Sequence, residues 1–170
     1  MGIFRLNHAV LYVREVARSA AFYRDVLGFR VTTSIGDKAV FLQAPDSTND
    51  HDLGLFALGT AAGDSAAGRS TVGMYHLAWE LGTLAELEQH QQRLAEAGAL
   101  VGASDHGTTK SLYAQDPDGL EFEVVWIVPA GLLDEQAIEA GTRISPLDLA
   151  KEKARYGADT RGGVGISSPA

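Results

Sequence analysis

A pattern of one strand, one helix and three further strands occurs twice along this 170-residue chain, and the repeat limits the folds available to it. Each half begins with a strand-forming stretch that contains a histidine and continues into an amphipathic helix that ends at a glycine. From His8 to Gly28 the interval is 28 − 8 = 20 residues, and from His76 to Gly98 it is 98 − 76 = 22 residues. We therefore predict an α+β fold built from two successive βαβββ modules.

The first module is expected to cover residues 4–58 and the second to cover residues 73–128, which together make one domain over residues 1–128. The first module has predicted strands at 4–13, 29–33, 40–43 and 51–58 and a predicted helix at 16–27. The second has predicted strands at 74–81, 100–103, 110–115 and 120–128 and a predicted helix at 83–97. Thr83 with Glu86 three residues later indicates a capping box, and Asp116–Gly119 is typical of a tight turn.

Residues 129–170 differ from both modules and are predicted to form a short helical extension with a flexible tail. The expected helices are 132–140 and 146–156, the second with Ser145 as its N-cap. From Gly157 onward the residues are small and polar, which predicts a frayed end.

Composition argues against several classes of partner. The formal charge is −8 and the 14 lysines and arginines are scattered, which argues against a nucleic-acid partner. No apolar run approaches the roughly 20 residues of a membrane helix, and no secretory leader is evident. The lack of cysteine excludes thiolate metal sites and thiol nucleophiles and fits a cytoplasmic protein. Homodimerisation is compatible with so small a unit.

Three ionisable residues, His8, His76 and Glu123, lie in largely apolar, strand-forming stretches. Both histidines lie in the first predicted strand of a module, and the glutamate lies in the last predicted strand of the second. A carboxylate buried beside imidazoles needs compensation, which a divalent cation supplies. Each residue alone also fits a structural or solvent-facing role. Together, two histidines and one carboxylate match the ligand set of non-haem Fe(II) oxygenases.

These residues lie in stretches that resemble the motifs of the vicinal oxygen chelate superfamily, which includes glyoxalases, fosfomycin and bleomycin resistance proteins and type I extradiol dioxygenases. The matching stretches are Leu6–Val10, Phe22–Phe29, Tyr75–Glu80, and Ser111–Tyr113 continuing through Asp116–Gly119 to Glu123. The resemblance implies that the two modules form a half-barrel, or cup, around one metal held by His8, His76 and Glu123. Within the superfamily the chain is most similar to single-domain extradiol dioxygenases of the catechol 2,3-type.

Three further residues carry the resemblance to the extradiol group: His51 in the fourth predicted strand, Tyr113 in the strand before Glu123, and His106 as a further pocket histidine. The resemblance implies that His51 takes a proton from the substrate and later returns it. It implies that Tyr113 hydrogen-bonds a bound oxygen. Taken alone, His51 also fits a surface histidine in an acidic stretch, and Tyr113 fits an ordinary strand aromatic.

The function that this resemblance implies is metal-dependent extradiol cleavage of a small catechol-type aromatic by O₂. Fe(II) is the implied metal, and Mn(II) or another divalent cation accepts the same ligands. The predicted strand at 51–58 has no glutamate to serve as the fourth ligand of a glyoxalase, and Lys110 alone offers the cationic charge that fosfomycin transferases need. Two alternatives stay open: non-catalytic sequestration of an aromatic natural product, and another metal enzyme of the superfamily, such as a glyoxalase or isomerase.

Overall fold

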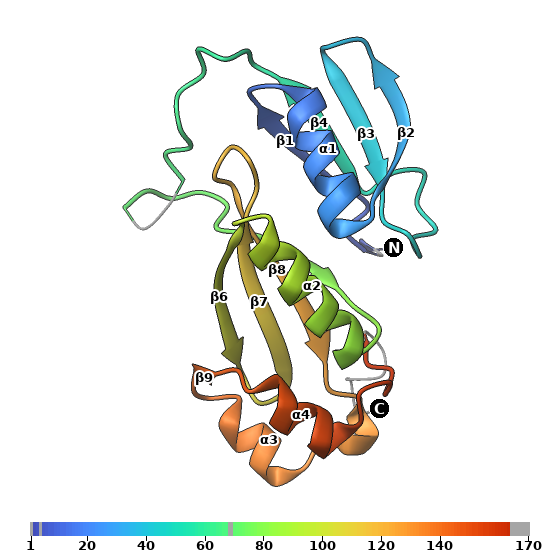
Figure 1. The fold of residues 1–170 in the computed structure, drawn as a ribbon, viewed down its shortest axis with the longest axis vertical. Coiled ribbons are helices and arrows are strands. Elements are labelled where there is room, and N and C mark those ends of the chain that lie inside the picture. The colour runs from blue at the N-terminus through green and yellow to red at the C-terminus, as the bar shows by residue number, and fades with distance from the viewer. Residues whose placement is uncertain (1, 4, 68–69, 164–170) are drawn as a thin grey trace. The chain divides into compact units, whose positions relative to one another are not determined.

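The computed structural model describes residues 2–3, 5–67 and 70–163 and shows an α+β chain with the predicted repeat of elements (Figure 1). The first set is β1 (Ala9–Val13), α1 (Val16–Leu27), β2 (Arg30–Ile35), β3 (Ala39–Gln43) and β4 (Leu53–Ala57). The second set is β5 (Leu77–Glu80), α2 (Leu84–Glu96), β6 (Leu100–Asp105), β7 (Thr109–Gln115) and β8 (Glu121–Ile127). These are followed by η1 (Ala130–Leu132), α3 (Glu135–Ala140), β9 (Ser145–Pro146) and α4 (Leu149–Tyr156). The predicted fold class and the twofold βαβββ order are therefore confirmed.

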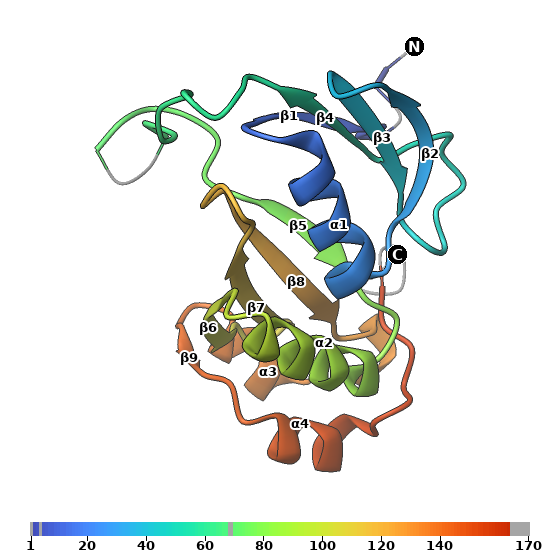
Figure 2. The ribbon, with the colours of Figure 1, turned by 45° about the horizontal axis from the view of Figure 1, so that its top comes forward.

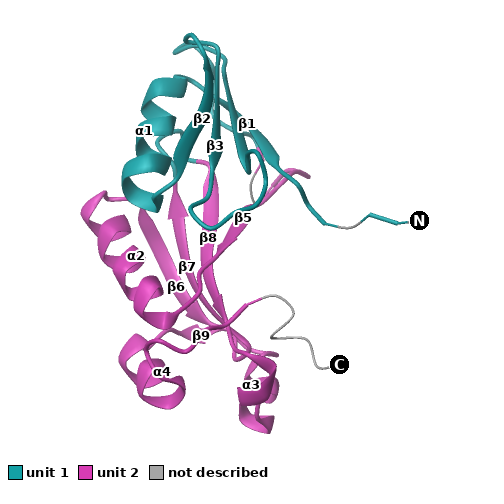
Figure 3. Ribbon diagram, turned by 90° about the vertical axis from the view of Figure 1, so that its right-hand side faces the viewer, with its two compact units in different colours: residues 1–66, 116–119 teal, residues 67–115, 120–170 magenta. Residues whose placement is uncertain are grey.

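The chain divides into two compact units, which Figure 3 shows in different colours. The first unit is residues 1–66 with 116–119, and the second unit is residues 67–115 with 120–170. Each unit has its own sheet, so each is described by itself. In the described part of the chain, no helix is long and apolar enough to cross a membrane.

The first unit is a four-stranded sheet in the order β1-β4-β3-β2, with α1 along one face (Figure 2). Strand β1 runs parallel to β4, and β3 is antiparallel to both of its neighbours. Helix α1 buries an apolar stripe at intervals of three to four residues: Val16, Ala20, Tyr23 and Leu27. Gly28 ends the helix with a φ of 79°, the left-handed conformation that glycine adopts readily, which confirms its predicted role as a cap.

The second unit is a five-stranded sheet in the order β5-β8-β7-β6-β9, in which β5 runs parallel to β8. Alternation along β8 buries Phe122, Val124 and Trp126. Helix α2 begins with the predicted capping box: the Thr83 hydroxyl accepts a hydrogen bond from the Glu86 N–H, and the Glu86 carboxylate accepts one from the Thr83 N–H. The sequence pattern therefore predicts both the start of this helix and the faces of this strand.

The turn between β7 and β8 belongs to the first unit although its flanking strands belong to the second. The Gly119 N–H donates to the Asp116 carbonyl over 2.9 Å, which confirms the predicted turn. The Asp118 carboxylate accepts from the Arg14 N–H at 2.8 Å, from Arg14 Nη1 at 3.0 Å and from Arg18 Nη2. A charge-assisted cluster therefore attaches the turn to the chain that links β1 to α1.

In the C-terminal extension, the predicted cap of the second helix is wrong. Ser145 is not a helix cap, because Ser145–Pro146 pair with β6 as strand β9. Asp148 caps α4 instead, by accepting a hydrogen bond from the Lys151 N–H at 3.0 Å.

The prediction that the chain is frayed from Gly157 onward is wrong for residues 157–163, which are hydrogen-bonded to the rest of the second unit. The Trp126 indole donates to the Thr160 carbonyl at 3.2 Å, and the Gly162 N–H donates to the Gly82 carbonyl at 2.9 Å. A Cβ at Gly162 would lie 2.1 Å from the Ile127 carbonyl oxygen, so glycine here permits close packing. The rest of the predicted tail, residues 164–170, and Phe4 in the first predicted strand lie outside the described residues.

Candidate metal centre

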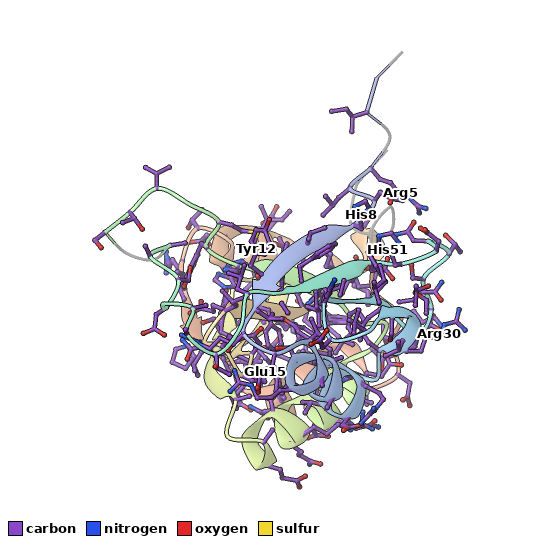
Figure 4. All side chains as sticks on the ribbon, turned by 90° about the horizontal axis from the view of Figure 1, so that it is seen from above. Arg5, His8, Tyr12, Glu15, Arg30 and His51 are labelled. Atoms are coloured by element: carbon purple, nitrogen blue, oxygen red, sulfur yellow. The ribbon has the colours of Figure 1, made fainter. Side chains whose placement is uncertain are left out.

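In the first unit, His8 and His51 lie side by side because they precede two adjacent parallel strands, His8 by one residue and His51 by two. The register pairs Ala9 with Leu53, and the Ala9 N–H donates to the Asp52 carbonyl at 2.9 Å. The centroids of the two imidazole rings are 4.5 Å apart. Figure 4 labels both side chains at this end of β1 and β4. Strand pairing therefore brings together two histidines that are 43 residues apart in sequence (51 − 8).

An acidic or amide side chain immediately before each histidine orients its ring. Nδ1 of His8 lies 2.8 Å from Asn7 Oδ1, and Nδ1 of His51 lies 3.0 Å from Asp50 Oδ2. The hydrogen bond from His51 lowers the pKa of the Asp50 carboxyl, so this carboxylate only accepts. In both rings Nδ1 therefore carries the proton, and Nε2 is the nitrogen that bears the lone pair in the neutral form.

In the second unit, His76 and Glu123 form a close pair. Strand β5 follows His76 directly, and the register of β5 with β8 places Ala78 opposite Glu123. Nε2 of His76 lies 3.1 Å from Glu123 Oε2, and the side chains are 24% and 13% exposed. Two ligands at right angles, each about 2.1 Å from a cation, are about 3 Å apart. The nitrogen and oxygen donors of this pair therefore fit adjacent ligand positions on one divalent metal.

Tyr113 lies next to that pair. The β7–β8 register places it opposite Glu123, and its ring centroid is 5.8 Å from that of His76. Its hydroxyl is 2.9 Å from Nε2 of His106, which directly follows β6. Burial raises the pKa of the Tyr113 hydroxyl, and the nearby Glu123 charge raises it further, so the hydroxyl stays protonated and can donate.

The structure thus groups the six sequence-predicted residues by unit: His8 with His51 in the first, and His76, Glu123, Tyr113 and His106 in the second. Within neither unit do the described residues bring three histidine, aspartate or glutamate side chains together as a metal site.

Two details of these groups differ from the sequence predictions. His8, His51 and His76 lie just before their strands and not within them as predicted. The orienting residues Asn7 and Asp50 were not predicted, although an Asx residue directly before a histidine was a readable signal in both places.

The order of elements is that of a fold built from two βαβββ modules, and comparison with solved structures supports this. The glyoxalase/bleomycin resistance protein/dioxygenase domain from Frankia sp. EAN1pec superposes with a TM-score of 0.62 at 20% identity, over 73% of this chain and 92% of that one. The chain belongs to the Glyoxalase/Bleomycin resistance protein/Dioxygenase superfamily, whose family model matches residues 5–124.

Two curated proteins are similar to most of this chain. Metapyrocatechase 2 of Cupriavidus necator is 31% identical over 159 residues, which cover 89% of this chain and 43% of that protein. Catechol-2,3-dioxygenase of Bacillus subtilis (strain 168) is 32% identical over 119 residues, which cover 70% of this chain and 40% of that protein. The chain thus spans less than half the length of these two relatives.

Proposed function

We propose that this chain cleaves the ring of a catechol-type aromatic in the extradiol position with a divalent metal and O₂. The observation that carries the proposal is the group His76, Glu123 and Tyr113, in which a nitrogen and an oxygen ligand lie beside a protonated hydroxyl. The names of the two relatives support the same reaction.

We propose His8, His76 and Glu123 as the ligands of the metal. The 3.1 Å separation of the His76 and Glu123 donor atoms supports two of them. The contact between Asn7 and Nδ1 of His8 supports the third ligand, because it leaves Nε2 of His8 as the nitrogen that can bind a metal. Fe(II) is the proposed metal and Mn(II) the alternative, since both accept nitrogen and oxygen ligands. When bound, such a metal would hold the two substrate oxygens and supply the redox chemistry with O₂.

The remaining residues have separate roles in this proposal. His51 moves a proton at Nε2, because Asp50 holds the proton at Nδ1. The Tyr113 hydroxyl donates a hydrogen bond to a substrate oxygen, and His106 orients that hydroxyl through Nε2 at 2.9 Å. These roles predict that substitution of His51 or Tyr113 slows turnover and leaves the metal in place.

The decisive experiment is O₂ uptake by protein loaded with Fe(II) without air, on addition of catechol and 2,3-dihydroxybiphenyl. We expect uptake with formation of a coloured ring-opened product. His76→Ala should lose both metal and uptake, whereas His51→Ala should retain the metal and lose at least about 100-fold in rate, as is usual for general acid–base residues. His90→Ala is the matched control. This remaining histidine lies on α2, and among the described hydrogen bonds its Nδ1 contacts only the Glu86 carbonyl.

Absence of uptake across the substrate panel with metal-loaded protein would refute ring cleavage. Tight binding of the aromatic without uptake, unaffected by a chelator, would point to sequestration instead. Equal metal loss in His51→Ala and His76→Ala would contradict the separate roles assigned to these two residues.

A further inference from the structure

The loop between β6 and β7, which carries His106, is enclosed by the C-terminal extension. Strand β9 pairs with the end of β6, where Ser104 lies opposite Pro146 and Asp105 lies opposite Ser145. The end of α3 lies directly against the loop: a Cβ at Gly107 would meet the Ala137 carbonyl oxygen at 2.2 Å. The extension therefore holds the chain on both sides of His106.

A buried charge cluster joins the same loop to α4. Lys110 on β7 is fully buried, with 0% exposure, and its Nζ lies 2.5 Å from Asp105 Oδ1. The same nitrogen lies 2.9 Å from Oε2 of Glu152, which is 1% exposed. It also lies 5.5 Å from the centre of the Tyr156 ring on α4. One lysine thus links the β6–β7 loop to the extension.

The cluster acts on the backbone beside His106. Asp105 Oδ1, which accepts from Lys110, also accepts from the Gly107 N–H at 2.8 Å. The His106 N–H in turn donates to the Thr109 carbonyl at 3.0 Å. The position of one carboxylate oxygen therefore determines the shape of the turn that presents the His106 ring to Tyr113.

Stability alone is a poor explanation for such a cluster. Burying charges costs several kcal/mol each, and apolar residues of similar volume commonly replace a buried ion pair without loss of stability. This cluster does restrict geometry, because the hydrogen bond from Lys110 Nζ to the Asp105 carboxylate is directional and the ion pair with Glu152 holds the same nitrogen close to α4. The cluster includes Asp105, the residue directly before His106, so it restrains the backbone that sets the direction of the His106 ring.

We propose that Lys110 and Glu152 are positioning residues, through which the C-terminal extension fixes His106 against the Tyr113 hydroxyl. The proposal rests on the proposed function for its catalytic meaning, since it concerns the same tyrosine. Its structural part is independent: the distance of 2.9 Å between His106 Nε2 and Tyr113 Oη depends on Lys110 and Glu152.

The test compares Lys110→Met and Glu152→Gln with Lys153→Met. Lys153 is the matched control, because it also lies on α4 but binds Glu88 of α2, at 2.6 Å, and not the β6–β7 loop. The first readout is the His106 Nε2 resonance of protein labelled with ¹⁵N in its histidine rings, assigned from its loss in His106→Gln. The reference shift for a broken contact comes from Tyr113→Phe.

We expect Lys110→Met and Glu152→Gln to move this resonance towards its position in Tyr113→Phe, and Lys153→Met to leave it unchanged. In the metal-loaded enzyme, the same two variants should lose about 10- to 100-fold in kcat, the scale expected for a misplaced group. Metal content should be unchanged and KM should change much less than kcat, because the proposed metal ligands are intact.

An unchanged His106 resonance in both variants would overturn the proposal, and so would a shift of equal size in Lys153→Met. If Lys110→Met does not fold, Glu152→Gln decides the question, since it keeps the side-chain shape and leaves Lys110 its contact with Asp105. If the unaltered protein takes up no O₂, the proposed reaction fails, while the resonance still decides whether the extension positions His106.

Discussion

Gly107→Ala should destabilise the second unit far more than Gly98→Ala, although the two glycines have nearly the same conformation. Their φ angles are +72° and +66°, in the left-handed region that costs other residues about 1–2 kcal/mol. The two sites differ in the room that they leave for a Cβ atom. A Cβ at Gly98 would meet nothing within 4 Å, whereas one at Gly107 would lie 2.2 Å from the Ala137 carbonyl oxygen and 2.5 Å from the Gly141 nitrogen.

The magnitude follows from the shift that α3 must make. Ordinary contact with a Cβ begins at 3.4 Å, so the Ala137 carbonyl must retreat by 3.4 − 2.2 = 1.2 Å. Overpacking of this kind costs about 1–3 kcal/mol beyond the backbone term. We therefore expect about 1–2 kcal/mol for Gly98→Ala and about 2–5 kcal/mol for Gly107→Ala. For a chain of this size the difference corresponds to roughly 2–12 °C in Tm.

Tryptophan fluorescence during urea and thermal unfolding is the appropriate assay. Both tryptophans of the chain, Trp79 and Trp126, lie in the second unit, so the signal reports on that unit. Amide hydrogen exchange at residues 137–141 should also accelerate in Gly107→Ala and not in Gly98→Ala. Equal loss of stability in the two variants would refute the reasoning, because it would show that α3 does not restrict the loop.

Two other predictions concern the turn between β7 and β8. Asp118→Asn should cost the first unit about 1–3 kcal/mol in urea unfolding, because a carboxylate only 6% exposed accepts the Arg14 N–H and guanidinium hydrogen bonds. Asp64→Asn, which removes an ion pair to Arg14 from a side chain 92% exposed, should change stability by less than about 1 kcal/mol, and an equal effect would contradict this. Burial, aided by the charge of Asp116, holds the pKa of the Tyr23 hydroxyl well above its ordinary value. Near pH 10 only the unfolded chain therefore loses this proton. The free energy of unfolding consequently falls as the pH rises above about 10. Tyr23→Phe should lose less Tm than the unaltered protein between about pH 9 and pH 11, and identical slopes would exclude this residue as a cause.

Local sequence signals predicted the helices and the turn because each depends on a few neighbouring residues. The Thr83–Glu86 capping box, the left-handed Gly28 and the turn closed by Gly119 need no information from elsewhere in the chain. The starts of three strands were predicted too early, at or before His8, His51 and His76. Composition does not show where a partner strand begins, and in this structure pairing starts only after each histidine.

The candidate site was predictable in its residues and not in its contacts. Motif spacing indicated His76, Glu123 and Tyr113, but their closeness comes from the order β5-β8-β7, which no local pattern specifies. The burial of Lys110 and its contacts with the extension were missed for the same reason. A lysine in an alternating strand ordinarily predicts a solvent-facing position, and only the packing of α4 explains why this one is buried.

The membership of Asp116–Gly119 in the first unit limits how the chain can be cut into fragments. A peptide ending at Ala66 would contain every strand and the helix of its sheet but would lack the acceptor for the Arg14 amide and the carboxylate near the Tyr23 hydroxyl. The first module therefore does not contain all the acceptors of its own polar contacts, since a hairpin turn encoded in the second module supplies two of them. Supplying that turn on a short linker after residue 66 should be the minimum needed for an autonomous first half.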